Sequence, residues 1–356
     1  MSLFLRLYHK ALRPVLTRGY AFLTYRTFDQ AFGQAVRDWK PDVIHAHDGV
    51  TLPAAARAAK DIGAKLIFDS HELELHRSPP LSRMRKWQVK RTERAFLPRA
   101  DRVMTVTERA ADYLAGEYAI PRPTVVFNAP PRVVEQVPPR WEVPNRVDIR
   151  WDARIHPREF VFAYTGNVTL NRGLEIVIIA LSRLQGFVAS HGQYRTRYHL
   201  VTVGKTQSDQ DTALKRLAKT YGVSSELHLL PPVAPHRVAQ YIATANASII
   251  PIMPVTLSYE YAMPNKLFEA MLSGNPIIAS DLVEMGPFVR DNGLGVTFDP
   301  ESIDDCLAKM VELIEQPARF RRSSERQAEL ASRFAWEAQE RTLLAMYDQM
   351  LAERDG

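Results

Sequence analysis

Short apolar segments that end in polar residues recur along this chain, and they constrain its fold more than any other feature. They are DVIHAHD (42–48), LIFDSHE (66–72), VMTVT (103–107), TVVFN (124–128), EFVFAYTG (159–166), YHLVTVG (198–204), ELHLLP (226–231), ASIIPI (247–252) and PIIAS (276–280). Stretches with helical character separate them. Strands that alternate with helices form parallel sheets with helices on both faces. In such sheets, functional residues lie just past the carboxyl ends of the strands.

The length and composition indicate two soluble-type domains. The chain has 356 residues, of which 46% are hydrophobic and 24% are charged, and this balance excludes wholesale disorder. The only cysteine is Cys306, so an internal disulfide and a cysteine-based metal centre are excluded. No apolar run approaches the roughly 18 residues of a membrane span. Arg6, Lys10 and Arg13 interrupt any apolar core of a signal peptide.

Prolines and changes of pattern divide the chain. Residues 129–158 contain six prolines and no clear periodicity, which is typical of a linker. We expect five parts: a basic helical segment at 1–40, a first Rossmann-like domain at 41–140, a linker at 141–158, a second domain at 159–333 and a final helix at 334–356.

Two basic stretches favour an anionic partner. Residues 1–40 hold seven Lys or Arg against two Asp, with large apolar residues between them at roughly helical spacing. This pattern is typical of a helix on a membrane surface, and also of a helix packed on a core with its charges in water. A second basic stretch lies at 83–99. No nucleic-acid-binding motif accompanies the charge, so we expect no nucleic-acid partner.

The segment YTGNVTLNRGLE (164–175) is a candidate phosphate site. A strand ends, Gly166 allows a tight turn, and a helix begins after Gly173. Amide groups at that helix start, with Arg172 beside them, can hold a diphosphate. Such strand–helix turns are also common without any ligand.

The segment MPNKLFEAMLSGNPIIASD (263–281) is a second candidate. Asn265 and Lys266 lie at a predicted helix start, where anions are favoured, and Glu269 follows on the same helix face. Its carboxylate could accept two ribose hydroxyls while Lys266 meets a phosphate. The alternative is a surface Lys–Glu pair with a helix cap.

Histidines end two of the predicted strands. His45, His47 and Asp48 lie close together and could suggest a metal site. We expect the alternation of side chains across a strand to separate them, and the sequence offers no further ligand cluster, so no metal site is predicted. A serine-hydrolase elbow and a P-loop are also absent from the sequence.

In their order along the chain, these segments resemble the family-4 glycosyltransferases, retaining enzymes with the GT-B fold. The resemblance lies in DVIHAHD, LIFDSHELE, VTERAADYL, VVFNAPP, GNVTLNRGLE, PNKLFEAMLSGNPIIASD and FAWEAQERTLLAMY. It implies two doubly wound Rossmann-like α/β domains with parallel sheets. The first would be on the acceptor side and the second would bind a nucleotide-sugar, with the last helix crossing back to the first domain.

The resemblance also implies roles for single residues. Glu269 would bind the nucleotide ribose. Arg172, with Lys266, would contact the donor diphosphate at the loop of Gly166 and Gly173, beside Asn265. His71 would lie near the donor sugar and the reaction centre.

Other positions depart from the family pattern or match it less specifically. Asn167 stands where the family often has a second arginine. The first acid of the family's paired glutamates falls at Tyr261, with Glu260 one residue early. His47 and Asn128 match positions on the acceptor side.

The implied activity is transfer of a sugar from a UDP- or GDP-linked donor to a hydroxyl acceptor with retention. No metal or other cofactor is required in that family. The basic stretches favour a lipid-linked or saccharide acceptor in surface polysaccharide or glycolipid assembly. They also favour a cytoplasmic protein that is peripheral on the inner face of the cell membrane.

Residues 1–40 lack the strand and glycine-rich loop that open the family's first domain, so we expect that domain to be incomplete. A truncated start, a natural short form and a non-catalytic protein all remain open. The alternatives in function are a non-catalytic membrane-associated subunit and a GT-B nucleotide-sugar epimerase or hydrolase.

Overall fold

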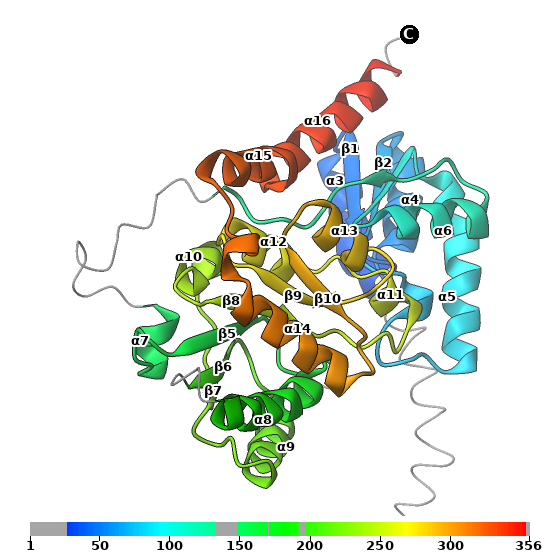
Figure 1. The fold of residues 1–356 in the computed structure, drawn as a ribbon. Helices are drawn as coiled ribbons and strands as arrows, with labels where there is room; N and C mark the ends of the chain where they lie inside the picture. Colours follow the sequence, from blue (N-terminus) through cyan, green and yellow to red (C-terminus); the bar gives the residue numbers. More distant parts are fainter. Residues whose placement is uncertain (1–26, 133–147, 170, 192–196, 354–356) are drawn as a thin grey trace, which may run out of the picture. The chain divides into compact units, whose positions relative to one another are not determined.

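The chain divides into two compact units (Figure 1). The computed structural model describes residues 27–132, 148–169, 171–191 and 197–353. Unit 1 comprises Met1–Val126 and Leu344–Gly356, and unit 2 comprises Phe127–Leu343. Most of the basic amphipathic segment predicted at 1–40 lies outside the described residues.

Unit 1 is built on a parallel sheet of four strands in the order β1-β2-β3-β4. The strands are β1 Val43–His47, β2 Lys65–Ser70, β3 Arg102–Thr105 and β4 Thr124–Val125. The helices are α3 Gln34–Trp39, α4 Leu52–Ile62, α5 Arg83–Phe96 and α6 Glu108–Tyr118. Shorter helical turns are η2 Asp29–Gly33, η3 Glu74–His76 and η4 Leu97–Arg99.

Local sequence signals set the helix bounds in unit 1. Thr107 caps α6 by accepting a hydrogen bond from the amide of Ala110, and Ser82 caps α5 through Arg85. Gly63 ends α4 with a φ of 70°, a left-handed conformation that glycine adopts without strain. These caps fix where each helix leaves the strand before it, and thus where the polar strand ends are exposed.

A buried acid lies between α5 and α6. The Glu93 carboxylate is 5% exposed and accepts a hydrogen bond from the Tyr118 hydroxyl. Burial raises the pKa of Glu93 to about 7, although the bond from Tyr118 lowers it. The folded state therefore holds a proton on Glu93 at pH values where the unfolded chain does not.

We predict that unit 1 loses stability as the pH rises. An acid whose pKa is raised by folding contributes its full stabilisation of the folded state below the pKa of the unfolded chain, about 4.5. That contribution is lost as the pH rises through the pKa of the folded state, about 7. The contribution is about 3 kcal/mol. Hydrogen exchange of peptides from 83–118 should quicken between pH 5 and 8 beyond the intrinsic rate. Glu93→Gln should abolish this dependence and Glu108→Gln, an exposed control, should leave it; an unchanged profile in Glu93→Gln would contradict the assignment.

Unit 2 is built on a parallel sheet of six strands in the order β10-β9-β8-β5-β6-β7. The strands are β5 Phe160–Thr165, β6 Tyr198–Val203, β7 Leu227–Leu230, β8 Ala247–Ile250, β9 Ile277–Ser280 and β10 Gly295–Phe298. The helices are α7 Ile149–Ala153, α8 Leu174–His191, α9 Ser208–Thr220, α10 Val238–Ile242, α11 Leu257–Glu260, α12 Asn265–Leu272, α13 Met285–Asp291, α14 Ile303–Glu315, α15 Ser324–Phe334 and α16 Trp336–Ala352. Shorter turns are η5 Pro235–Arg237 and η6 Pro317–Phe320.

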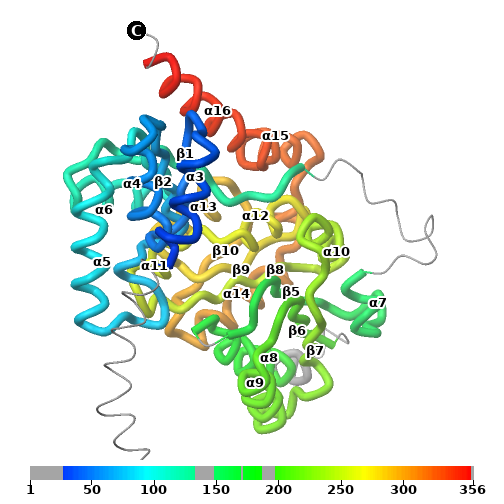
Figure 2. Tube along the Cα trace, turned by 180° about the vertical axis from the view of Figure 1, so that it is seen from behind, coloured from blue at the N-terminus to red at the C-terminus, as the bar shows by residue number. Residues whose placement is uncertain are grey.

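Alternation along the strands gives unit 2 a core on each face of its sheet. Ile249 and Ile278 pack with α8, α9 and α14. Ile250 and Ile277, one residue away, pack on the other face with α12, α13 and α15. Figure 2 shows the same unit from behind, with these helices along the strands. Two buried faces explain why the strands read as continuous apolar runs.

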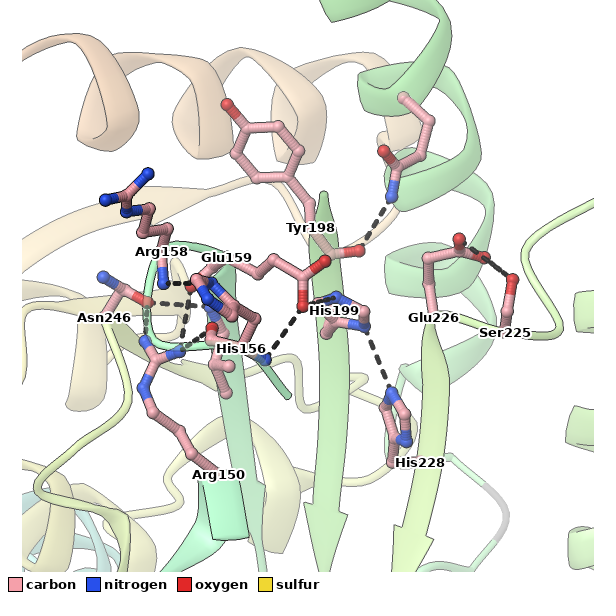
Figure 3. Close-up of polar contacts among 12 residues, drawn as sticks. Arg150, His156, Arg158, Glu159, Tyr198, His199, Ser225, Glu226, His228 and Asn246 are labelled. Carbon is pink, nitrogen blue, oxygen red and sulfur yellow. Dashed lines mark hydrogen bonds and ion pairs between the residues drawn. The ribbon is translucent and has the colours of Figure 1, made fainter. Parts of the chain in front are cut away.

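Part of the linker predicted at 141–158 is structured. Asp148 caps α7 by accepting from the amides of Arg150 and Trp151. The Arg150 guanidinium donates to the carbonyls of Thr244 (2.6 Å) and Glu159 (2.9 Å), and to the side chain of Asn246 (Figure 3). These bonds hold α7 against the rest of unit 2. The proline-rich segment predicted as a linker is therefore partly structured.

Two histidines lie on neighbouring strands in the same region. His199 Nδ1 is 3.1 Å from His228 Nε2, and Figure 3 shows this contact as a dashed line between a residue of β6 and a residue of β7. Burial lowers the pKa of both rings. The pair lies among the residues around Arg150 and Glu159, near the starts of the strands.

Both units therefore have the parallel, Rossmann-like α/β architecture that the sequence predicts, and the strand order of unit 2 reverses as in a doubly wound sheet. Helix α16 begins in unit 2, and its residues from Leu344 onward belong to unit 1. The elements α11, α13, β10, α14 and α15 were not predicted. Among the described residues, the structure contains no helix with the length and apolarity needed to span a membrane.

Candidate functional site

The strand order of unit 2 reverses between β5 and β8. The chain runs from β5 outward to β6 and β7, then returns to pair β8 with the other edge of β5. In open α/β sheets, ligands bind at such a switch point, beyond the carboxyl ends of the strands. Gly166 follows β5 and Pro251 follows β8, so the loops after these two strands form the candidate site.

Close backbone approach holds the loop after β5 in place. The Gly166 amide donates to the carbonyl of Val203 at 3.0 Å, and Gly166 has a φ of +98°. A Cβ on Gly204 would lie 2.0 Å from the Gly166 carbonyl oxygen, and a Cβ on Gly173 would lie 1.8 Å from the Pro251 carbonyl oxygen. Glycine is thus required where the loop passes β6 and where α8 begins against β8.

Lys266 is buried at this loop without a counter-charge in contact. The residue is 8% exposed, and its Nζ lies 3.7 Å from the centre of the Tyr164 ring. Within the part of the chain that the structure describes, Nζ has no hydrogen-bond partner. Burial, and then the charge of Arg172, lower the pKa of Lys266 well below its usual range. The amine therefore has hydrogen-bond donors that no described residue uses.

Glu269 lies one helical turn from Lys266 on α12. Its Oε2 accepts a hydrogen bond of 2.7 Å from the Thr165 hydroxyl at the end of β5. Burial raises the pKa of Glu269, while the Thr165 bond and the Lys266 charge oppose that rise. Among the described residues, no hydrogen bond to the second carboxylate oxygen is found, so that oxygen can accept from a further donor.

Arg172 completes the group. Its guanidinium carbon lies 5.1 Å from the centre of the Tyr259 ring, and its Nε donates to the Thr169 hydroxyl at 3.3 Å. Tyr259 belongs to α11, which follows β8, so the loops after β5 and β8 share this contact. The exposed Asn167 uses its carbonyl to accept from the Tyr164 hydroxyl at 2.9 Å.

The remaining predicted donor residues lie nearby in the chain. Asn265 is the first residue of α12 and is exposed. Pro264 precedes it without a side-chain cap among the described contacts, and the Leu267 amide donates to the Pro264 carbonyl at 2.9 Å. The amides of Asn265 and Lys266 are the ones left without a cap. Glu260 ends α11, and Tyr261 follows it, both half-buried.

In unit 1, a cluster of histidines surrounds one carboxylate. His47 Nδ1 lies 3.0 Å and His71 Nε2 lies 2.6 Å from Oδ2 of Asp69. His45 stacks on His47 with ring centres 4.4 Å apart, and its Nδ1 lies 2.7 Å from the Tyr347 hydroxyl on α16. Burial, its largest cause, lowers the pKa of His45.

The expectation that strand alternation separates the two strand histidines is wrong. His45 and His47 are two residues apart, so they project from the same face of β1. Ligand atoms of His45, His47 and Asp69 lie within 4.8 Å of one another, a spacing that a metal ion can bridge. Asp69 enters from β2, where it pairs with His47 in the sheet register.

Sequence reasoning missed Asp69, Thr165 and Tyr259. Asp69 interrupts an apolar strand with a charge that is 5% exposed, and this interruption was the available signal. Thr165 and Tyr259 carry no such signal. Asn128, predicted on the acceptor side, is exposed in the segment after β4 and belongs to unit 2.

Two family models match the chain. Residues 5–131 match "Glycosyl transferase 4-like domain" and residues 159–316 match "Glycosyl transferases group 1". The chain belongs to the glycosyltransferases that carry these two domains. The family prediction from the ordered motifs is confirmed.

Relatives and solved structures agree with this placement. The chain is 25% identical over 262 residues to a D-inositol 3-phosphate glycosyltransferase of Rhodococcus opacus, covering 72% of this chain and 54% of that relative. It thus spans about half the length of that protein. Sucrose-phosphate synthase from Thermosynechococcus elongatus has a TM-score of 0.73 at 18% identity, covering 94% of this chain and 80% of that one. The Anabaena protein Alr3699/HepE in complex with UDP has a TM-score of 0.69 at 16% identity, covering 90% and 82%. These structures establish the GT-B fold.

Proposed function

We propose that the protein transfers a sugar from a nucleotide-sugar to a hydroxyl acceptor with retention of configuration. The observation that carries this proposal is the group at the switch point of unit 2. This group consists of the Lys266 amine, the Arg172 guanidinium and the Glu269 carboxylate, which lie beside glycine-formed loops. The amine has no hydrogen-bond partner in the part of the chain that the structure describes. Two cations and open amides suit a diphosphate, and the free carboxylate oxygen suits ribose hydroxyls.

The proposed reaction requires no protein base. The bond from the anomeric carbon to the diphosphate oxygen breaks, and the acceptor oxygen bonds to the same face of that carbon. The acceptor proton passes to the departing diphosphate oxygen. Arg172 and Lys266 stabilise the charge that develops there, and His71 stabilises the sugar as its ring gains positive charge.

We propose a UDP- or GDP-linked donor and no metal cofactor. The UDP complex of Alr3699/HepE makes UDP the first nucleotide to test. The residues around the proposed diphosphate site are cationic, which suits charge compensation by the protein itself.

The activity test uses the full chain with UDP- and GDP-sugars and a lipid-linked saccharide acceptor. Proton NMR of the product should show the donor's anomeric configuration in the new bond. An inverted product would contradict the retaining mechanism. A free sugar or an epimerised donor, formed without acceptor, would instead identify a hydrolase or an epimerase.

A non-catalytic subunit is the second candidate, favoured by Tyr261, which replaces the acid expected there from the family pattern. A non-catalytic subunit would fold, with or without nucleotide binding, and would show no turnover. Transfer by the purified chain would exclude it.

We further propose that helix α5 docks on an anionic membrane from the cytoplasmic side, in surface polysaccharide or glycolipid assembly. Arg83, Trp87, Arg91 and Arg94 are exposed at helical spacing on α5. Trp87 is 61% exposed, and the Arg91 guanidinium lies 5.5 Å from its ring centre. Basic residues beside an exposed aromatic ring are typical of helices that lie in a membrane interface.

Charge reversal on α5 should release the protein from vesicles. Lys86→Glu with Arg91→Glu should weaken binding to phosphatidylglycerol-containing vesicles at least about tenfold in co-sedimentation. Trp39→Ala removes an exposed ring outside α5 and should leave binding unchanged. Deletion of residues 1–27 tests the other basic stretch. If the α5 variant binds vesicles as well as the wild type, and binding is lost only when residues 1–27 are deleted, α5 is not the docking helix.

A further inference from the structure

The carboxylate of Asp69 is shared by two imidazoles and is fixed by the sheet. Asp69 lies near the end of β2, between β1 and β3, and its carbonyl accepts from the Asp48 amide at 3.0 Å. One oxygen, Oδ2, contacts both His47 and His71. The other, Oδ1, is buried and has no hydrogen-bond partner among the residues described. A charged group in this position is costly unless the rings neutralise it.

The two rings differ in what surrounds them. The contact to His71 is the shorter, 2.6 Å against 3.0 Å for His47. His71 is also near a second carboxylate, because its Nδ1 lies 3.8 Å from Oδ1 of the exposed Asp48. His47 instead stacks on His45, and burial lowers the pKa of the His45 ring. The acidic groups therefore act chiefly on His71.

We propose that Asp69 is the positioning residue for His71. It orients the ring and keeps a proton on Nε2, so that Nδ1 is the nitrogen presented to a sugar oxygen. The catalytic part of this inference rests on the proposed function, whereas the ring orientation does not. The family resemblance assigned no role to Asp69, although this residue lies within the segment LIFDSHELE.

The electrostatics of the cluster agree with this geometry. The hydrogen bond from Asp69 is the largest cause that raises the pKa of His71, and burial opposes it. The charges of Asp69, Asp48 and Glu72 raise the pKa further. His47 faces His71 with ring centres 5.4 Å apart. The neutral ring, when it forms, should keep its proton on Nε2, since Asp69 accepts there.

A metal ion would use the same atoms in a different way. The ligand atoms of His45, His47 and Asp69 lie within 4.8 Å of one another. However, Oδ2 of Asp69 is already within hydrogen-bond distance of both His47 and His71. A metal on this oxygen would displace at least the His71 contact, so metal binding through Oδ2 and the proposed positioning exclude each other.

Ring NMR of the folded, full-length chain tests the positioning without any activity. Nitrogen–proton correlation spectra, assigned with His71→Gln and recorded in EDTA, report the titration midpoint and the tautomer of His71. We expect a midpoint above the ordinary value of about 6.5 and a neutral tautomer with the proton on Nε2. Asp69→Asn should lower the midpoint clearly more than Asp48→Asn, its matched control.

Two results would overturn the proposal. One is a neutral His71 in the wild-type protein that carries its proton on Nδ1. This measurement needs no variant, so it does not depend on whether Asp69→Asn folds. The other is a folded Asp69→Asn protein with the wild-type midpoint. Zinc added in place of EDTA should leave the His71 signals unmoved at stoichiometric concentration, and their loss would assign the cluster to metal instead.

A kinetic experiment then tests the link to catalysis. Asp69→Asn should lower kcat about ten- to a hundredfold with little change in donor KM, because the ring is misplaced while unit 2 is intact. Activity should rise as His71 loses its Nδ1 proton, and this rise should move to lower pH in the variant. An unchanged kcat and pH profile would remove Asp69 from the reaction. Failure of the wild type to bind any nucleotide would reject the proposed function and leave the NMR result standing.

Discussion

Gly173→Ala is expected to destabilise unit 2 by at least about 4 kcal/mol and to abolish measurable nucleotide binding. A Cβ at this position would lie 1.8 Å from the carbonyl oxygen of Pro251. This oxygen is a backbone atom, and Pro251 directly follows β8. The residue also has a φ of +70°, which alanine adopts only with strain. The clash cannot be relieved by a side-chain rotation, so either α8 or the loop after β8 must move. Thermal unfolding should show a fall of about 10 °C or more.

Gly222→Ala is the matched control. Gly222 has nearly the same φ, +71°, but a Cβ there would meet nothing within 4 Å. Only the conformational strain remains, about 1 kcal/mol, and nucleotide affinity should be unchanged. Equal effects of the two substitutions would show that close packing against Pro251 does not hold the site.

Glu269→Ala is expected to weaken nucleotide binding by about 1.5–3 kcal/mol, or roughly ten- to a hundredfold in Kd. The carboxylate is held by Thr165 at 2.7 Å, so its free oxygen is already placed for a ribose hydroxyl. Its loss also leaves Lys266 without the nearby negative charge that favours its protonated form. Calorimetric titration measures the change directly.

Glu301→Ala removes an exposed carboxylate of unit 2 and should leave the Kd at its wild-type value. Circular dichroism of both variants checks that the sheet is intact. A Kd for Glu269→Ala equal to wild type would reject the ribose assignment while leaving the diphosphate assignment to Lys266 and Arg172 open to its own test.

Local pattern was sufficient to predict the two parallel α/β sheets and the turn between β5 and α8. The apolar runs locate β5 and β6 because both faces of this sheet are buried. Gly166 and Gly173 stand out because each lies at the boundary of a regular element, after β5 and before α8. The short strand β10 was missed, since GVTF is only four residues long and begins with a glycine. That glycine is required because a Cβ on Gly295 would lie 1.9 Å from the Ile277 carbonyl oxygen, which a sequence pattern does not report.

The unit 1 cluster could not be predicted because it depends on strand pairing. The sequence places His45 and His47 on one strand and Asp69 on another, but only the register opposes His47 to Asp69. The contact from Tyr347 to His45 joins residues 302 positions apart. Likewise, residue types alone do not decide whether Glu260 or Tyr261 meets the donor, because that depends on how α11 ends.

Calorimetric titration of the full chain with UDP, GDP and ADP tests the central claim most directly. The titrations are run first in EDTA and then with magnesium. The account predicts that one nucleotide binds selectively in EDTA and that magnesium adds little, because Lys266 and Arg172 compensate the diphosphate charge. A folded sample that binds none of the three, or binds only with magnesium, would contradict it.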